Sequence, residues 1–322
     1  MKPLHFIIAA ALVVILIGSV LYPVIQDSEM GGKSIDVLII DGQSNAEYGG
    51  IEVCNPAVLN EEYTEAPAHN VYYYGTSTAP ANQWDWSHKW GYAWSAFHIH
   101  NAYNYTTDQW IIGGYEPILG NTLAEKSGND TLVINMGIGA RSIADLLPNG
   151  ADANYSWTLL DRALNEISQD YKNINIAGVV WIQGETDGAQ GTTVEQYKTS
   201  FVELMNGFKK YGANEFYLVA TRDEYGGNAS IAQDQLAQEY SNVIMATEIT
   251  ETFTIENGML DANPIHYSQK GRDAISFAIR DQIIVPPETH NNEYGGLLLI
   301  IPVLFFIALI AMGARMILNG RD

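Results

Sequence analysis

Short apolar runs alternate with longer amphipathic segments through the middle of this chain, and this rhythm restricts the fold more than any other feature. Short, continuous apolar runs suit strands that are buried on both faces of a parallel sheet. They cover residues 36–40, 131–135, 176–182, 215–220 and 242–246. The segments between and after them predict helices over residues 118–126, 157–171, 194–210, 231–240 and 269–282. Such alternation predicts a three-layer α/β domain with a parallel five-stranded sheet.

Four segments with chemically useful side chains lie next to predicted strand ends or before the last helix. Active residues of open α/β sheets gather at the carboxyl ends of strands. The segments read GQSN at 42–45, NMGIGARSIADLLP at 135–148, VVWIQGETDG at 179–188 and DANPIHYSQKG at 261–271. We therefore expect all four to meet at one edge of the sheet.

Each segment offers one element of acyl-transfer chemistry. Gly42 permits a tight turn that exposes Ser44. Glycine in the segment 135–148 lets a backbone N–H approach a ligand oxygen, and the carboxamide of Gln183 can donate to an oxyanion. His266 lies on a loop from which it can reach back across the sheet. Taken singly, each has an ordinary structural explanation, such as a turn-forming serine or a surface histidine.

The four segments in this order resemble the SGNH hydrolases, and most closely the carbohydrate acetylesterases that include the sialate O-acetylesterase-like and acetylxylan esterase proteins. That branch carries a GQSN block, a glycine-serine-isoleucine block, a W-x-Q-G-E block and a late histidine block. Here they read GQSN at 42–45, GARSI at 139–143, WIQGETD at 181–187 and HYSQKG at 266–271. The resemblance covers roughly residues 34–284 and implies a flavodoxin-like sheet and hydrolysis of acetyl esters on sugars.

The resemblance also implies a role for each block. Ser44 would attack the ester carbonyl, and His266 would take its proton and return it to the leaving alcohol. The N–H groups of Ser44 and Gly139, with the side chain of Gln183, would form the oxyanion hole. The same blocks contain the candidates for substrate contact, which are Gln43, Asn45, Arg141 and Asn263.

The chain departs from the family pattern at the acidic residue that would support the histidine. The family often has an aspartate three residues before the histidine, and here that position is Asn263. Two carboxylates could replace it, Glu185 in the QGE segment and Asp261 five residues before His266, and we favour Glu185. A third option is a Ser-His dyad assisted by the neutral Asn263. In such enzymes a carboxylate next to the histidine fixes the tautomer of the imidazole and stabilises the imidazolium that forms during the reaction.

Residues 47–110 interrupt the strand–helix rhythm with an insertion rich in aromatic side chains. Its tryptophans could form a platform for sugar rings or pack the insertion onto the sheet; they are Trp84, Trp86, Trp90 and Trp94. The insertion, and the missing aspartate, motivate an alternative class: a non-catalytic carbohydrate-binding or surface-structural protein that keeps the fold. No segment indicates a metal or another cofactor.

The formal net charge of −21 excludes nucleic acid as the expected partner, because phosphate binding needs Lys and Arg. Apolar runs at 6–24 and 297–318 have lengths that suit membrane helices, and basic residues flank their outer ends. We therefore expect a membrane anchor or signal peptide at 1–30, an extracytoplasmic esterase domain at 31–290, and a transmembrane helix with a short basic tail at 291–322. Both termini would be cytoplasmic. This double anchor motivates a further alternative, an SGNH lipase or thioesterase that acts on membrane lipids.

Overall fold

The computed structural model describes residues 33–47, 63, 66–75 and 98–285, all within the compact unit Met1–Pro286. A seven-stranded sheet in the order β3-β2-β6-β1-β7-β8-β9 runs through these residues. The five predicted strands are confirmed as neighbours in this sheet, and all their mutual pairings are parallel. They are β1 (Ser34–Gly42), β6 (Asp130–Asn135), β7 (Asn173–Ile182), β8 (Phe216–Val219) and β9 (Val243–Thr247).

The order of these five strands is the flavodoxin-like 2-1-3-4-5 order that the resemblance implies. The prediction of a five-stranded sheet was incomplete, because two further strands lie within the predicted insertion. β2 (Val71–Gly75) pairs with β6 in parallel, and β3 (His98–Asn101) pairs with β2 in antiparallel orientation. β2 is the short run VYYYG, which lies among other aromatic residues and has no clear apolar periodicity. A separate two-stranded sheet joins β4 (Tyr103–Asn104) to β5 (Gln109–Trp110).

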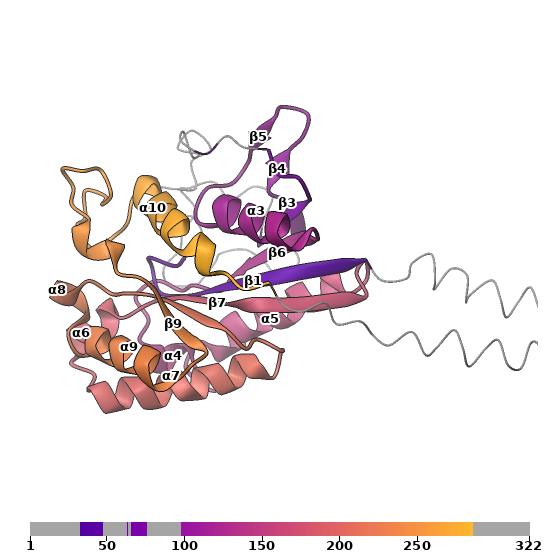
Figure 1. Cartoon of the computed structure of the whole chain (residues 1–322). Coiled ribbons are helices and arrows are strands. Elements are labelled where there is room, and N and C mark those ends of the chain that lie inside the picture. The colour runs from indigo at the N-terminus through magenta and orange to yellow at the C-terminus, as the bar shows by residue number, and fades with distance from the viewer. Residues whose placement is uncertain (1–32, 48–62, 64–65, 76–97, 286–322) are drawn as a thin grey trace, which may run out of the picture. The chain divides into compact units, whose positions relative to one another are not determined.

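Helices cover both faces of the sheet (Figure 1). The five predicted helices are confirmed with small shifts of their ends, and the last one finishes in a 3-10 turn, η4 (Arg280–Gln282). They are α3 (Glu116–Ser127), α5 (Ala153–Ile167), α7 (Val194–Lys209), α9 (Asn228–Glu239) and α10 (Gln269–Ile279). Short helices α4 (Ile143–Leu146), α6 (Glu185–Gln190) and α8 (Asp223–Gly226) and the 3-10 helix η3 (Ile249–Thr252) complete the order. In two of the site segments, those at 135–148 and 179–188, the short helices α4 and α6 therefore begin.

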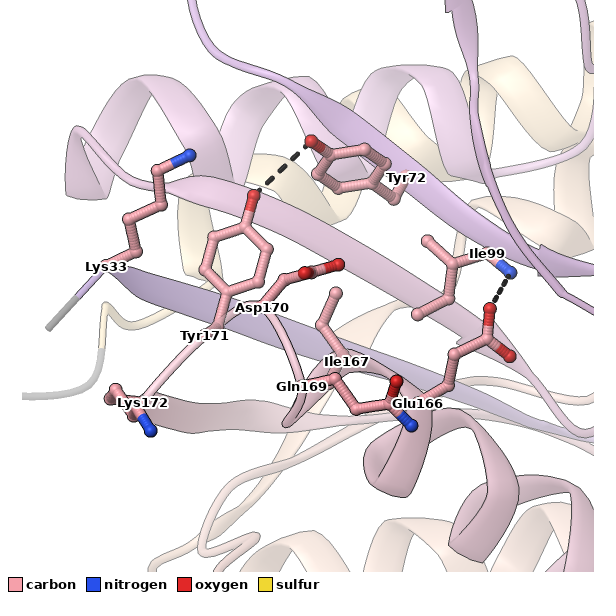
Figure 2. Close-up of a pocket in the computed structure, with 9 residues that line it drawn as sticks. All are labelled: Lys33, Tyr72, Ile99, Glu166, Ile167, Gln169, Asp170, Tyr171 and Lys172. Atoms are coloured by element: carbon pink, nitrogen blue, oxygen red, sulfur yellow. Dashed lines mark hydrogen bonds between the residues drawn. The ribbon is translucent and has the colours of Figure 1, made fainter. Parts of the chain in front are cut away.

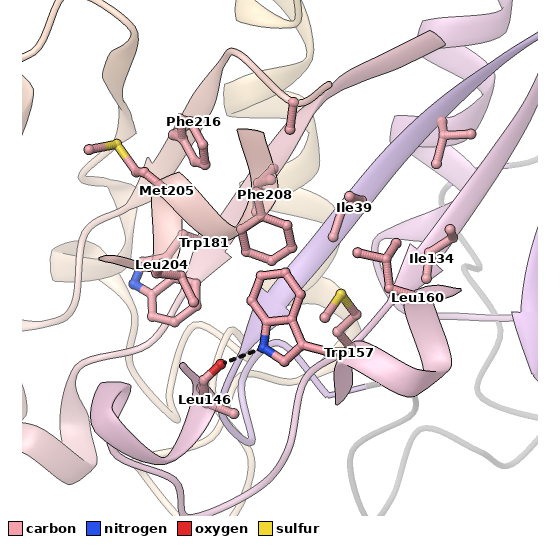
Figure 3. Packing of buried hydrophobic residues seen from close by; sticks show 14 of the residues in the cluster. Ile39, Ile134, Leu146, Trp157, Leu160, Trp181, Leu204, Met205, Phe208 and Phe216 are labelled. Carbon is pink, nitrogen blue, oxygen red and sulfur yellow. Dashed lines mark hydrogen bonds between the residues drawn. The ribbon is translucent and has the colours of Figure 1, made fainter. Parts of the chain in front are cut away.

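Alternate side chains of β1 point into two separate cores. Val37 and Ile39 pack into the core beneath α5, α7 and α9, whereas Leu38 and Ile40 pack into the core beneath α3 and α10. In the first core the indole of Trp157 packs on Phe208 with ring centroids 4.6 Å apart, and its Nε1–H donates to the Leu146 carbonyl at 3.0 Å (Figure 3). This contact ties α4, which follows one of the site segments, to the core.

None of the helices in the described ranges is long and apolar enough to cross a bilayer. The predicted membrane segments 6–24 and 297–318 lie outside those ranges, as does most of the insertion, including its four tryptophans. These predictions therefore stay predictions.

Asp41, at the end of β1, predicts an unusual dependence of stability on pH. Its side chain is 1 % exposed, Oδ1 accepts the Gly42 N–H at 2.8 Å, and Oδ2 has no hydrogen-bond partner. Burial raises the pKa of Asp41 to about 8. A folded-state pKa above the unfolded value favours the folded state at low pH, and that stabilisation is lost as pH rises toward about 8.

We expect Asp41→Asn to raise the free energy of unfolding at pH 8 by a few kcal/mol, and to change it little near pH 4. Urea unfolding across this pH range measures the difference. Asp36 provides the matched control, because it is equally buried on β1 but accepts hydrogen bonds from Asn129 and Asn175. Asp36→Asn should not stabilise the protein. Equal curves for wild type and Asp41→Asn would contradict the prediction.

Candidate active site

The turn after β1 carries Ser44 at the carboxyl edge of the sheet. Gly42 has a φ of +145°, and a Cβ added there would lie 2.0 Å from the Ile182 carbonyl oxygen of β7, so only glycine fits. The N–H groups of Ala46 and Glu47 both donate to the Gln43 carbonyl, at 2.8 and 2.9 Å. These bonds close a tight turn that leaves Ser44 partly accessible while both of its neighbours are buried.

His266 lies on a hairpin that approaches Ser44 from the far end of the chain. Its Nε2 lies 3.1 Å from Ser44 Oγ, although 222 residues separate the two in sequence. The hydroxyl can donate to Nε2 when the imidazole proton is on Nδ1. The predicted meeting of a nucleophilic hydroxyl and a basic imidazole is thus present in the geometry.

The pairing of this hairpin brings Asp261 opposite His266. An antiparallel bridge joins Leu260 to Tyr267, and the Asp261 N–H donates to the His266 carbonyl at 3.0 Å. Residues directly opposite in an antiparallel pair extend their side chains on the same face, with Cβ atoms about 5 Å apart. Asp261 therefore lies where a carboxylate could reach the imidazole.

Glu185, the other candidate carboxylate, is 5 % exposed and contacts the nucleophile turn. Its Oε1 accepts the Nδ2–H of Asn45 at 2.6 Å, and its Oε2 is buried without a hydrogen-bond partner. Burial is the main cause that raises the pKa of Glu185, and the hydrogen bond from Asn45 partly offsets it. Glu185 therefore contacts Asn45, and Asn45 in turn contacts the histidine hairpin.

Asn45 joins the nucleophile turn to the histidine hairpin. It is fully buried, and its Nδ2 donates to the Ile265 carbonyl at 2.9 Å as well as to Glu185. Its Oδ1 accepts the Tyr267 N–H at 3.0 Å. The residues on both sides of His266 are thus bonded to the residue after Ser44. Asn45, predicted to bind substrate, has its side-chain groups engaged within the protein.

Arg272 and Tyr115 hold the main chain of the same turn. The Asn45 carbonyl accepts Arg272 Nη1–H at 2.9 Å and the Tyr115 hydroxyl at 2.7 Å, and both side chains are buried. The guanidinium also lies 5.4 Å from the centre of the Tyr115 ring. Sequence reasoning missed Arg272. The signal that could have found it is a charged side chain among the apolar positions of the last helix, which is unusual for a buried face.

We expect Asn45→Ala to lower kcat strongly while it changes KM little, because Ser44 and His266 would lose their common support. It should also lower the free energy of unfolding by about 3 kcal/mol, since several buried polar groups lose their partners. Steady-state kinetics and urea unfolding measure the two effects.

Asn121→Ala is the matched control, because Asn121 of α3 is also fully buried but donates to Glu125 of the same helix and to Tyr63. That variant should lose stability and keep the kcat of its folded fraction. A normal kcat in folded Asn45→Ala would refute the positioning role.

Gln183, at the end of β7, is 1 % exposed and bonded on all sides. Its Nε2 donates to Asp187 Oδ2 at 2.5 Å and to the Arg141 carbonyl at 3.1 Å, and its Oε1 accepts the Tyr197 hydroxyl at 2.9 Å. Both N–H groups therefore have acceptors in the protein. Its place in an oxyanion hole stays a prediction, and its evident role is to link β7 to the loop that carries Gly139.

This loop, which follows β6, lies beside the nucleophile turn. The Ile138 N–H donates to the Gly42 carbonyl at 3.0 Å, and Asp187 accepts the Ile143 N–H at 2.8 Å. Ala140 has a φ of +58°, a left-handed conformation that is strained for a residue with a Cβ. A strained loop fixed at both ends keeps the Gly139 N–H close to the Ser44 turn.

The remaining predicted substrate-binding residues differ in their accessibility. Gln43 is buried, and its Oε1 accepts the Thr186 N–H at 3.0 Å. Arg141 is partly exposed and forms an ion pair with buried Asp152, and Asn263 is exposed at the tip of the histidine hairpin. Arg141 and Asn263 are therefore the two predicted contacts that solvent, and a substrate, can reach.

A cavity of about 530 Å³ lies away from these residues. It is lined by Lys33, Glu166 and two tyrosines, Tyr72 and Tyr171, whose hydroxyls lie 3.3 Å apart (Figure 2). Lys33 precedes β1, whereas Ser44 follows it. The nine residues of β1, at about 3.3 Å each, separate the cavity from Ser44 by roughly 30 Å. The cavity is not part of the candidate active site.

The family model of the carbohydrate esterase, sialic acid-specific acetylesterase family matches residues 34–276, about three quarters of the chain. This range contains Ser44, Gly139, Gln183 and His266. No curated protein sequence shows a significant match.

Similar solved structures cover most of the chain at low identity. A protein from Arabidopsis thaliana is 14 % identical, with 78 % of this chain and 98 % of that chain covered and a TM-score of 0.52. NanS is also 14 % identical, with coverage of 78 % and 97 % and a TM-score of 0.51. A carbohydrate acetylesterase from Xanthomonas citri is 16 % identical, with coverage of 77 % and 56 % and a TM-score of 0.45. At these identities the first two show a shared fold.

Proposed function

Because the chain belongs to the carbohydrate esterase, sialic acid-specific acetylesterase family and is thus a carboxylic ester hydrolase, we propose that it removes O-acetyl groups from carbohydrates through an acyl-enzyme on Ser44. One observation carries this proposal: Ser44 Oγ and His266 Nε2 lie 3.1 Å apart at the carboxyl edge of the sheet. That distance is within reach for proton transfer from hydroxyl to imidazole.

In the proposed reaction, Ser44 Oγ attacks the acetyl carbonyl while His266 Nε2 takes the hydroxyl proton. The tetrahedral intermediate collapses, the bond to the sugar oxygen breaks, and the imidazolium returns the proton to the leaving sugar hydroxyl. Water then attacks the acetyl-serine while His266 takes a proton from it, the bond between Ser44 Oγ and the acyl carbon breaks, and the imidazolium returns the proton to Oγ as acetate leaves. No group other than the chain's own side chains and water is needed to balance these steps.

We propose Asp261 rather than Glu185 as the carboxylate that supports His266. The support is the hairpin register, which pairs Asp261 with His266 and directs both side chains to one face. Glu185 instead accepts a hydrogen bond from Asn45, and burial raises its pKa, which disfavours the charge that an imidazolium partner must carry.

We further propose that the N–H groups of Ser44 and Gly139 bind the oxyanion. Their support is the close approach of the two loops, because the Ile138 N–H already bonds to the Gly42 carbonyl. Gln183 would act indirectly, by holding the carbonyl of Arg141 two residues beyond Gly139. A membrane-tethered, extracytoplasmic position for this domain is a separate proposal, which rests on the apolar runs at 6–24 and 297–318.

Acetate release from O-acetylated sugars by the full-length protein tests the proposal directly. Fluorophosphonate should label Ser44, and p-nitrophenyl acetate should be cleaved faster than p-nitrophenyl esters of long fatty acids. Sugar binding without labelling would support the non-catalytic alternative. A preference for long acyl chains would support the lipase or thioesterase alternative.

A further inference from the structure

The hairpin that carries His266 needs support from the rest of the domain if the imidazole is to stay within reach of Ser44. A two-stranded hairpin is only marginally stable by itself. The tip of this one, Asn263 and Pro264, is exposed, and the bond from the His266 N–H to the Asn263 carbonyl is local to the hairpin. The distance of 3.1 Å between His266 Nε2 and Ser44 Oγ is near the limit of about 3.2 Å for proton transfer. A small movement of the hairpin would therefore separate the nucleophile from its base.

Arg222, on the loop after β8, holds the tip of this hairpin. Its Nη1–H donates to the Pro264 carbonyl at 2.7 Å. Pro264 lies two residues before His266, and the Arg222 side chain is only 12 % exposed. A hydrogen bond from an ionised donor is roughly twice as strong as one between neutral groups. This bond therefore fixes the main chain close to the proposed base.

Arg222 is itself held at its base and along its side chain. The residue before it, Thr221, is buried, and its hydroxyl donates to the Gln183 carbonyl at 2.8 Å. Further out, Arg222 Nη2 lies 2.6 Å from Glu224 Oε1, and the guanidinium lies 5.2 Å from the centre of the Tyr225 ring. A side chain fixed in this way can transmit the position of the sheet to the hairpin.

The contact of Arg222 complements the contacts of Asn45. Asn45 bonds to the Ile265 carbonyl and to the Tyr267 N–H, on either side of His266. These two bonds hold the hairpin from the nucleophile turn after β1, whereas Arg222 holds it from the loop after β8. The hairpin is thus tied to two different strands of the sheet.

We propose that Arg222 is a positioning residue for His266: by holding the hairpin tip, it keeps Nε2 within proton-transfer reach of Ser44 Oγ. This inference rests on the proposed function of Ser44 and His266. Arg222 acts through the Pro264 carbonyl and is therefore not a catalytic residue. The planar guanidinium suits this task, because its fork of N–H groups can donate to Pro264 and to Glu224 at once, whereas an ammonium group is a point charge on a flexible stem.

Arg222→Ala should lower kcat for p-nitrophenyl acetate by about 10- to 100-fold and change KM little, because a displacement of about 1 Å can cost that much in rate. Arg222→Lys keeps the charge and one possible donor to Pro264, so it should recover part of the loss. Steady-state kinetics with the full-length protein measures both. A raised KM at unchanged kcat would identify Arg222 as a substrate contact and overturn the inference. Unchanged constants in Arg222→Ala would overturn it too.

Arg280→Ala is the matched control. The Arg280 guanidinium lies 5.1 Å from the centre of the Phe277 ring, and its Nε lies 3.9 Å from Asp281 Oδ1. Arg280 therefore shares the aromatic and acidic contacts of Arg222, and among the contacts described for the two, it lacks the bond to the hairpin. This variant should keep the wild-type kcat. An equal loss of kcat in Arg280→Ala would show a general effect of charge removal, and the inference would fail.

A second measurement does not depend on catalysis. In protein labelled with ¹⁵N-histidine, at a pH where the imidazole is neutral, the His266 ring should carry its proton on Nδ1 while Nε2 accepts from Ser44. Comparison with His266→Gln assigns the resonances. In Arg222→Ala they should shift toward the averaged values of a free imidazole. Resonances that stay in place would overturn the inference. The expected shift in a protein that cleaves no ester would support the positioning role and refute the proposed function instead.

Discussion

Replacing Ser44 with alanine is expected to lower kcat for p-nitrophenyl acetate by about 10⁴–10⁶-fold. The substitution removes the oxygen that forms the acyl-enzyme in the proposed mechanism, while the main-chain N–H groups of the turn stay in place. KM should change little, since the hydroxyl contributes mainly to the transition state. The measurement is steady-state hydrolysis by full-length protein, together with loss of fluorophosphonate labelling.

Ser168→Ala is a suitable control for this variant. Ser168 is exposed at the end of α5, where its hydroxyl donates to the Asn165 carbonyl at 2.7 Å. It should hydrolyse the ester at the wild-type rate. Hydrolysis by Ser44→Ala at that same rate would refute the assignment of the nucleophile and, with it, the proposed mechanism.

Asp261→Asn is expected to lower kcat by about 10³–10⁴-fold, whereas Glu185→Gln should lower it less than about tenfold. Asp261→Asn keeps the shape of the side chain but removes the charge that, in the proposed mechanism, stabilises the imidazolium and selects its tautomer. Glutamine at 185 keeps an oxygen that can accept from Asn45 and removes a charge that burial already disfavours. Steady-state kinetics of the two variants at pH 7 compares them directly.

Each variant acts as the control for the other, because each loses one of the two candidate carboxylates. The reverse ranking would identify Glu185 as the partner of His266 and would restore the preference drawn from the sequence. Small effects in both variants would indicate a Ser-His dyad. In that case the exposed Asn263 on the histidine hairpin is the next group to replace.

Much of the fold could be predicted because it depends on local pattern. Strands buried on both faces are short and apolar, and the helices that cover them have one apolar side. The alternation of strands and helices can therefore be recognised from the sequence pattern. The strands that were missed, β2 and β3, show why this reasoning ends at the insertion. Their aromatic and histidine residues have no distinctive period, and only pairing with β6 makes β2 a strand.

The site could be predicted only in outline. Motif order located Ser44, Gly139, Gln183 and His266 at strand ends and on the late loop, and all four lie at the expected edge. The pattern did not show that Gln183 and Asn45 use their side chains inside the protein. It also did not show that Arg222 bonds to the hairpin of His266. These facts depend on which atoms approach from distant segments.

By itself the sequence determined the layered α/β architecture and the family resemblance, because apolar period and motif order act over short stretches of chain. Only the tertiary structure decided that Asp261 lies opposite His266 in the hairpin, and which polar groups are already engaged within the protein. The register of one hairpin and the packing of segments up to 227 residues apart set those contacts. The hydrogen-bond partners of a polar side chain determine what it can bind or donate to, and packing across the whole domain determines those partners.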